Sequence, residues 1–373
     1  MKILMLHRQQ SAVGSYRTWV PARYLMSKGH EVTYWEDAPY RHKIGRDKDA
    51  RHKWLMDHQG EFDIIWVDRA MDEQELGEFA GLRHYSPDAR MIVDFDDDFT
   101  NIPHWNTAHK GFLPGQPLRE YGLMHLALSE MATVSTKVLA KRFRHLTHRI
   151  MPLLNCIDPA DWDNLPVCPD RAKDPHLRIL YGGASGHYGD LDEAREGIQA
   201  VLDKPPCPIR LICFGALPGW LHEASRTYPG RVISQPWVPF SYYPRAVAWG
   251  GFDVAIAPLA DHIFNEAKSN IKWLEAGIQG ISFLCSDVGP YKAIPSEAAI
   301  KVDNTSAQWA QGLREMLKDA NLRKRLRTRA NEIVRRDWTV DQMGQQWENA
   351  IEEACKRPRI QSAEDARLPA RSG

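Results

Sequence analysis

The chain has 373 residues, 43% of them apolar, which is more than one hydrophobic core usually serves and predicts two domains of ordinary size. Its 48 basic and 48 acidic side chains give a formal charge of zero, which excludes a global field toward nucleic acid or an anionic membrane. No apolar run approaches membrane-spanning length, and the first apolar run is too short for a signal peptide. The six cysteines show no metal-ligand spacing, so we expect reduced, buried thiols in a soluble, cytoplasmic protein.

Short apolar runs alternate with longer amphipathic runs through the first 150 residues. Buried strands are predicted at 3–6, 32–35, 62–67 and 91–95, and helices at 16–28 and 72–85. Repeated strand-helix units are typical of a parallel sheet with helices on both faces. Residues 1–152 are therefore predicted to form one doubly wound α/β domain.

Periodicity vanishes where prolines and aspartates crowd together, and residues 153–175 are predicted to be a linker. A second alternating series follows, with strands at 179–181, 209–214, 231–233, 254–257, 282–285 and 300–302, and helices at 191–202, 266–278 and 306–319. It predicts a second doubly wound domain at 176–336. An amphipathic segment at 337–355 is expected to pack back on the first domain, and 356–373 to be a disordered tail. Such tandem domains bind ligands at the strand carboxyl ends, so we expect the site in a central cleft.

The helix predicted at 266–278 carries two lysines and a glutamate on one stripe. Helical spacing puts Lys268, Lys272 and Glu275 together, while apolar residues line another stripe. The amides of residues 268–270 would lie in the first turn and bind an anion. An ammonium about 4 Å from a phosphate contributes roughly 4 kcal/mol at an effective dielectric of 20, so the lysines would dominate and would stabilise an expelled diphosphate. From spacing alone, a solvated helix face is the alternative.

Five stretches occur in the order known from one enzyme family. They are MKILMLHRQQSAVGSYRTWVPARYLMSKGHEVTYW, MATVSTKVLAKRF, IMPLLNCIDPADW, RILYGGASGHYGDL and FNEAKSNIKWLEAG. To about Cys355, the chain resembles the GT-B glycosyltransferases, and most closely retaining family 4 as found in bacterial and phage genomes. The resemblance implies two tandem Rossmann-like domains, and a metal-independent transfer of sugar from a nucleotide diphosphate, first of all UDP, to an acceptor hydroxyl. It also implies retention of the anomeric configuration.

The resemblance places the sugar donor in the second domain. Glu275 takes the place of the second glutamate of the family's Glu-x7-Glu motif, which binds the nucleotide ribose. The first glutamate, which contacts the donor sugar, falls on Ala267, and Glu266 or Lys268 would substitute for it. Gly14 would bring backbone close to the donor phosphate, or else be an ordinary turn glycine with positive φ.

The stretch GGASGHYGDL is a second candidate for binding the sugar donor. Ser185 and Gly186 lie in a tight loop, and His187 would bind phosphate or the donor sugar, or else be a solvated loop histidine. We expect Asp190 to cap a helix. The glycines match neither a dinucleotide fingerprint nor a P-loop, which excludes a dehydrogenase and a kinase. By the resemblance, Trp237 lies in the nucleobase pocket, with the core as its alternative.

Three carboxylates, Asp96, Asp97 and Asp98, follow a predicted strand and cluster at its carboxyl end. A divalent-metal site and an acidic turn that caps the next segment are two possible roles. Since the strand belongs to the acceptor-side domain, we favour carboxylates that orient the acceptor, with Asp97 or Asp98 taking its proton. His104 and Trp105 would form the floor of the acceptor site.

The residues singled out fall into three groups, with no metal ligand among them. The catalytic candidates are Lys268, Asp97, Asp98 and His187. The donor-binding candidates are Gly14, Ser185, Gly186, Trp237, Val238, Lys268, Ser269, Asn270, Lys272 and Glu275. The acceptor-binding candidates are Ser15, Tyr16, Arg17, Asp96, His104 and Trp105.

The acceptor is left open as a saccharide, a lipid-linked sugar or a modified DNA base. Basic clusters at 41–53 and 141–149 would suit an anionic acceptor, whereas the cluster at 323–329 is typical of a solvated helix face. Two alternatives from other classes remain. One is a phage-type enzyme that glycosylates a hydroxylated DNA base, in the host cytoplasm. The other, suggested by Ala267, is a catalytically silent protein that binds nucleotide sugars.

Overall fold

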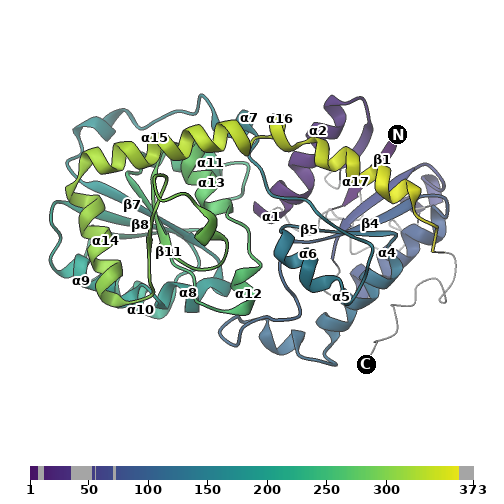
Figure 1. Cartoon of the computed structure of the whole chain (residues 1–373), viewed down its shortest axis with the longest axis horizontal. Coiled ribbons are helices and arrows are strands. Elements are labelled where there is room, and N and C mark those ends of the chain that lie inside the picture. The colour runs from purple at the N-terminus through teal and green to yellow at the C-terminus, as the bar shows by residue number, and fades with distance from the viewer. Residues whose placement is uncertain (7–11, 35–52, 55, 70–72, 361–373) are drawn as a thin grey trace. The chain divides into compact units, whose positions relative to one another are not determined.

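The computed structural model describes residues 1–6, 12–34, 53–54, 56–69 and 73–360 (Figure 1). The chain divides into two compact units. The first comprises Met1–Asn101, Lys110–Asn155 and Met343–Gly373, and the second comprises Ile102–His109 and Cys156–Gln342. Among the described residues, no helix combines the length and the apolar character that crossing a membrane requires.

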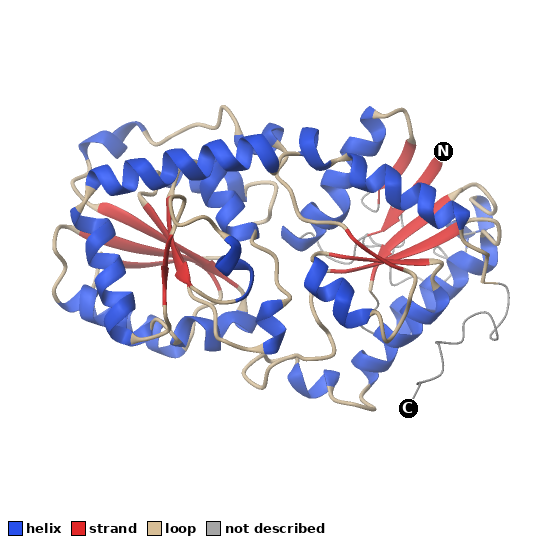
Figure 2. Cartoon of the chain, in the orientation of Figure 1, coloured by secondary structure: helices blue, strands red, loops and turns tan. Residues whose placement is uncertain are grey.

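The first unit is built on a sheet of six parallel strands in the order β2-β1-β3-β4-β5-β6, with helices packed around it (Figure 2). The strands are β1 (Lys2–Leu6), β2 (Glu31–Tyr34), β3 (Ile64–Asp68), β4 (Arg90–Phe95), β5 (Met131–Val134) and β6 (Ile150–Pro152). The helices and turns are α1 (Ala12–Gly14), the π-helical turn η1 (Ser15–Trp19), α2 (Val20–Ser27), α4 (Glu73–Tyr85), the 3-10 turn η5 (His109–Phe112), α5 (Pro117–Leu128), α6 (Lys137–Phe143) and α17 (Gln345–Lys356).

The second unit has its own six-stranded parallel sheet, in the order β12-β11-β10-β7-β8-β9. The strands are β7 (Leu177–Gly183), β8 (Ile209–Gly215), β9 (Val232–Gln235), β10 (Val254–Ala257), β11 (Ser282–Ser286) and β12 (Ile300–Val302). The helices and turns are α7 (Pro159–Trp162), η6 (Pro169–Lys173), η7 (Ser185–His187), α8 (Tyr188–Asp192), α9 (Arg195–Asp203), α10 (Gly219–Thr227), α11 (Tyr243–Gly250), α12 (Ile263–Glu266), α13 (Ile271–Ile278), η8 (Gly289–Ala293), α14 (Ser306–Lys318), α15 (Ala320–Asp337) and α16 (Val340–Met343).

The strand order of the second sheet reverses between β7 and β10, which pair in register through Ile179 with Val254 and Leu180 with Ala255. Ligands of doubly wound sheets bind outside the carboxyl ends of the strands at such a reversal. The segments that leave these two ends are η7 with α8, and the loop that leads into α12 and α13. This topology directs attention to those segments.

The predicted α/β class with two doubly wound sheets is confirmed, and the ten predicted strands all lie in observed strands to within two residues. The sequence missed β5 and β6, which have only four and three residues. The predicted linker is not featureless, because it contains α7 and η6. Asp158 caps α7 by accepting a hydrogen bond from the amide of Ala160, and Pro159 follows it, which is a regular helix-start signal.

The C-terminal helix α17 packs within the first unit. Trp347 is buried and meets the ring of Tyr24 edge-on, with ring centroids 5.3 Å apart. Gln346 bonds the backbone of Leu154 twice, accepting from its amide at 2.8 Å and donating to its carbonyl at 3.0 Å. The last helix therefore completes the core of the unit that the first residues begin.

Candidate functional site

A buried carboxylate, Asp190, joins the two segments that leave β7 and β10. Its side chain is 2% exposed. One oxygen accepts a hydrogen bond from Nδ1 of His187 at 2.7 Å. The other oxygen accepts from the side-chain amide of Asn265 at 2.6 Å and from the backbone amide of Ala260 at 3.1 Å. Burial alone would raise the pKa of Asp190, but the hydrogen bond and charge of His187, together with Lys268, outweigh it and lower the pKa. Asp190 is therefore an ionised residue inside α8 that holds the two segments together. The prediction that it caps a helix is wrong, because His187 occupies the N-cap position of α8.

The helix predicted at 266–278 is broken in the structure. The short helix α12 ends at Glu266, and α13 begins only at Ile271. The amides of residues 268–270 therefore precede the first turn of α13, and the amide of Lys268 already donates to the carbonyl of Asn265. The amphipathic spacing is continuous, but the contacts of Asn265 with Asp190 and with the carbonyl of Ala260 override it.

Two lysines bring positive charge to this place. Lys272 lies in the first turn of α13 with its Nζ 5.6 Å from the ring centroid of Tyr181, and the Nζ of Lys268 lies 4.7 Å from that of Phe264. Burial, with the nearby charge of Lys268, lowers the pKa of Lys272 to about 8, although Asp190 and Glu275 oppose the shift. Within the described part of the chain, no carboxylate oxygen lies within 4.0 Å of Lys272 Nζ. An anionic ligand would supply the missing countercharge.

Glu275 lies one turn beyond Lys272 on α13 and is half-buried. Its charge acts on the buried hydroxyl of Tyr243, whose pKa is raised first by burial and then by Glu275. Ala267, by contrast, is 1% exposed and packs into the core, whereas its neighbour Glu266 is exposed. The lysines and Glu275 therefore share one environment, as the spacing predicted, while the place of the first motif glutamate is a packing position.

The stretch Ile102–His109 covers the loop that follows β7. The ring of Trp105 lies against that of His262, with centroids 5.2 Å apart. A Cβ at Gly189 would lie 2.6 Å from the Trp105 ring, and one at Gly186 would lie 2.9 Å from the side-chain amide of Asn106. Trp105 was expected to form the acceptor floor with His104. It packs in the second unit against the predicted donor loop instead, whereas His104 is exposed.

Arg17, an expected acceptor contact, is a buried structural residue. It is 4% exposed and forms a two-pronged ion pair with Asp94, at 2.8 and 2.6 Å. Its remaining nitrogen donates to the carbonyl of Leu153 and, at 3.0 Å, to the side chain of Asn155. The expectation is wrong because these bonds consume the guanidinium. Tyr16, its neighbour, is likewise buried and does not present its side chain to an acceptor.

Asp98, an expected catalytic base, is fully buried in a hydrogen-bonded turn. Its oxygens accept from the amide and hydroxyl of Thr100, from the side chain of Asn101, and from Arg142 at 3.0 Å. All its acceptor capacity is used within the first unit, so the acidic turn is the correct alternative for this residue. Asp96 and Asp97 are half-buried beside it, and they remain candidates for contact with an acceptor.

The other predicted site residues differ in backbone conformation and exposure. Gly14 has a right-handed helical backbone with φ of −59°, so the turn with positive φ is wrong, and Ser15 beside it is half-buried. Trp237 follows β9 and is 58% exposed, which excludes the core alternative, while Val238 is half-buried. Ser185 lies in η7, half-buried.

Three further expectations bear on ions and thiols. The described residues contain no group of three or more His, Cys, Asp and Glu side chains that could hold a metal ion. The basic cluster at 41–53 lies outside the described residues except for Lys53, and Arg142 of the second cluster is committed to Asp98. All six cysteines are free, but only Cys156, Cys213 and Cys285 are buried, whereas Cys168 and Cys207 are half-buried and Cys355 is exposed.

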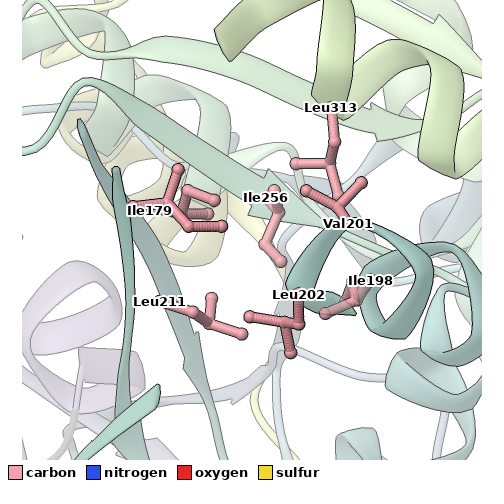
Figure 3. A pocket seen from close by; sticks show the side chains of 8 residues that line it. Ile179, Ile198, Val201, Leu202, Leu211, Ile256 and Leu313 are labelled. Atoms are coloured by element: carbon pink, nitrogen blue, oxygen red, sulfur yellow. The ribbon is translucent and has the colours of Figure 1, made fainter. Parts of the chain in front are cut away.

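A void of about 10 Å³ lies inside the second unit (Figure 3), and none of the residues of the polar cluster lines it. Its walls are aliphatic side chains of β7, β8, β10, α9 and α14, namely Ile179, Ile198, Val201, Leu202, Ile209, Leu211, Ile256 and Leu313. Without polar partners it suits neither water nor a polar substrate, and we interpret it as a packing gap.

Sequence reasoning missed the role of Asp190 in holding the two segments together. Asp190 and Asn265 stand in the two stretches that drew attention, yet neither was assigned to the site. The spacing of His187 and Asp190, three residues apart where a helix starts, was the available signal, because it puts both side chains on one face. The contact with Asn265 spans 75 residues and has no local signature.

No protein-family model matches the sequence, and no curated protein is recognisably similar to it. The structure does resemble solved enzymes over almost the whole length of both chains. Sucrose-phosphate synthase from Thermosynechococcus elongatus is 14% identical with a TM-score of 0.65, covering 95% of this chain and 98% of that one. A glycosyltransferase from Rickettsia africae is 12% identical, with a TM-score of 0.64 and coverage of 96% and 99%. Anabaena HepE in complex with UDP-glucose is 13% identical, with a TM-score of 0.65 and coverage of 94% and 99%. The chain has the GT-B fold of these proteins.

The close approach of Trp105 to Gly189 yields a stability prediction. Gly189→Ala should destabilise the protein by about 1 to 3 kcal/mol, because the new methyl group collides with the indole ring. Gly219→Ala is the control, since nothing lies within 4 Å of a Cβ there. Urea unfolding measures both. In a Trp105→Leu background, Gly189→Ala should cost much less, and an equal cost in both backgrounds would show that the ring is not the obstacle.

The buried ion pair between Arg17 and Asp94 in the first unit yields a second stability prediction. Arg17→Met should lower the free energy of unfolding by about 3 to 5 kcal/mol, because it leaves the Asp94 carboxylate buried without its cation. Replacing both partners, Arg17→Met with Asp94→Leu, should cost less. Arg144→Met, at an exposed position of α6's C-terminal end, is the control for chemical denaturation. A loss no larger than that of the control would contradict a stabilising role for the pair.

Proposed function

We propose that this chain is a glycosyltransferase that takes its sugar from a nucleoside diphosphate sugar bound in the second unit, at the ends of β7 and β10. The observation that carries the proposal is the half-buried ammonium of Lys272, which lies beside Lys268 without a close carboxylate, at the strand reversal. The shared fold with known glycosyltransferases supports it. The UDP-glucose bound to Anabaena HepE makes a UDP-sugar the first donor to test.

The proposed reaction breaks the bond between the anomeric carbon and the diphosphate oxygen and forms a bond from that carbon to the acceptor oxygen. Negative charge develops on the departing diphosphate, and the ammonium groups of Lys268 and Lys272 stabilise it most in the transition state. The acceptor hydroxyl passes its proton to a carboxylate as the new bond forms, and Asp97 is the proposed base. The lysines supply the countercharge, so no step is assigned to a divalent metal. We also propose that the anomeric configuration is retained, as the resemblance to retaining glycosyltransferases implies.

Other residues of the second unit have proposed roles in holding the nucleotide. The carboxylate of Glu275 would accept hydrogen bonds from the two ribose hydroxyl groups. The exposed ring of Trp237 would stack on the base, with backbone groups near Val238 reading its edge. Ser185 and Gly186, before His187, and Ser269 and Asn270, before α13, would contribute polar groups next to the lysines.

On the acceptor side, Asp96 and Asp97 are the proposed orienting groups, with Ser15 in the same proposed region. The acceptor is proposed to be a saccharide or a lipid-linked sugar. A hydroxylated DNA base is less well supported, because Arg142 of the basic cluster at 141–149 is paired with the buried Asp98. Release of nucleoside diphosphate in the presence of acceptor distinguishes an enzyme from a silent binding protein.

Lys272→Met tests the proposal directly, since it keeps the aliphatic stem and removes the charge. It should weaken the binding of UDP, and of UDP-sugar, by on the order of 10²-fold, and reduce kcat/KM at least as much. Lys292→Met, at an exposed lysine of η8, is the control. Calorimetric titration with UDP is the measurement. Wild-type affinity in the Lys272 variant, with an unchanged melting temperature, would refute the diphosphate site.

The lowered pKa of Lys272 also predicts a pH dependence. Its charged form binds the diphosphate, and in the free protein this form is lost as the pH rises through about 8. The affinity for UDP should therefore fall above about pH 8, and binding there should take up a proton. Titrations between pH 7 and 9.5 in two buffers of different ionisation enthalpy measure both effects. In Lys272→Met this pH dependence should vanish.

A further inference from the structure

The contact of Nδ1 with the buried Asp190 fixes the orientation of the His187 ring. Nδ1 lies 2.7 Å from an oxygen of Asp190, whose other oxygen accepts from Asn265 and from the amide of Ala260. The two amides and the nearby Lys268 favour the charged form of Asp190 and help to hold its pKa below the usual range, so this carboxylate has no proton to give. Nδ1 of His187 is therefore the protonated nitrogen of this pair.

The surroundings of the ring keep the second nitrogen unprotonated. Burial, with the positive charges of Lys272 and Lys268, lowers the pKa of His187 to about 4, and the hydrogen bond and charge of Asp190 only partly offset this. These are the charged groups that face the ring, from α13, the turn before it and α8. At neutral pH the imidazole is thus neutral, and Nε2 carries a lone pair.

Nε2 is available to a ligand. The His187 side chain is 20% exposed, and Nε2 forms no hydrogen bond with any residue that the structure describes. A lone pair accepts hydrogen bonds and repels the oxygens of an ionised diphosphate, which only accept. A hydroxyl group, in contrast, donates to it.

We propose that Nε2 of His187 accepts a hydrogen bond from a hydroxyl group of the donor sugar, with Asp190 as the positioning residue that holds the ring. The inference rests on the proposed function and deepens it. The two lysines hold the diphosphate, and the histidine beside them recognises the sugar. The lysine ammonium groups donate to the phosphate oxygens, which can only accept. Nε2 of His187 accepts from a sugar hydroxyl group, which can donate.

UDP lacks the sugar, so comparing the affinities for UDP and for a UDP-sugar separates contacts with the diphosphate from contacts with the sugar. The probes are UDP and the tightest binder among UDP-glucose, UDP-galactose and UDP-N-acetylglucosamine. His187→Ala should weaken the UDP-sugar about three- to tenfold and leave UDP within twofold. His222→Ala, at an exposed histidine of α10, should change neither. Equal weakening of both probes would overturn the inference in favour of a phosphate contact, and a lower kcat with unchanged affinities would overturn it in favour of a proton-transfer role.

A spectroscopic readout tests the protonation state separately. Nitrogen chemical shifts of labelled histidine should show His187 at pH 7 as the neutral tautomer with its proton on Nδ1, before and after UDP is added. An imidazolium in the UDP complex would overturn the inference. Asp190→Asn should disturb this tautomer and lower the affinity for the UDP-sugar more than that for UDP. If the wild-type protein binds neither UDP nor any UDP-sugar, the proposed function itself fails, and the inference with it.

Discussion

The arrangement of the second unit depends on one ionised carboxylate held away from water. Asp190 stands where the strand order reverses, and its hydrogen bonds tie the turn after β7 to the segment after β10. Burying an ionised carboxylate costs free energy unless hydrogen-bond donors surround it. The loss of any of its three hydrogen bonds would therefore be unfavourable, which keeps the three bonded groups in place. One of them, His187, gains a fixed tautomer. Another, Asn265, interrupts the helix, so that the next one, α13, begins at Ile271 with Lys272 in its first turn.

The first unit uses buried carboxylates differently. Asp94 and Asp98 both lie at the carboxyl end of β4, yet each is neutralised by an arginine, Arg17 in one case and Arg142 in the other. These pairs close the unit internally rather than presenting charge to a ligand. Only Asp96 and Asp97 remain partly open at this strand end. Both units are therefore built on a parallel sheet of six strands, but they differ in what their strand ends offer.

The alternation of apolar and amphipathic runs was enough to predict the fold class and nearly all the strands, because burial and periodicity are local properties. The grouping of Lys272 with Glu275 was also predictable, since both lie on one helix face. The roles of Arg17 and Asp98 were not. A carboxylate after a strand looks the same in sequence whether its partner is a substrate or an arginine 44 residues further on. The break before Ile271 likewise follows from a long-range bond of Asn265 that leaves the spacing intact.

The route of the backbone has a further consequence. The boundaries between the units fall after residues 101, 109, 155 and 342, so the polypeptide passes from one unit to the other four times. Neither unit is a continuous piece of sequence. If the gene were divided in the middle, the N-terminal fragment would lack α17. The C-terminal fragment would lack Trp105, whose indole ring covers Gly189. During synthesis on the ribosome, the first core thus stays incomplete until the final helix emerges.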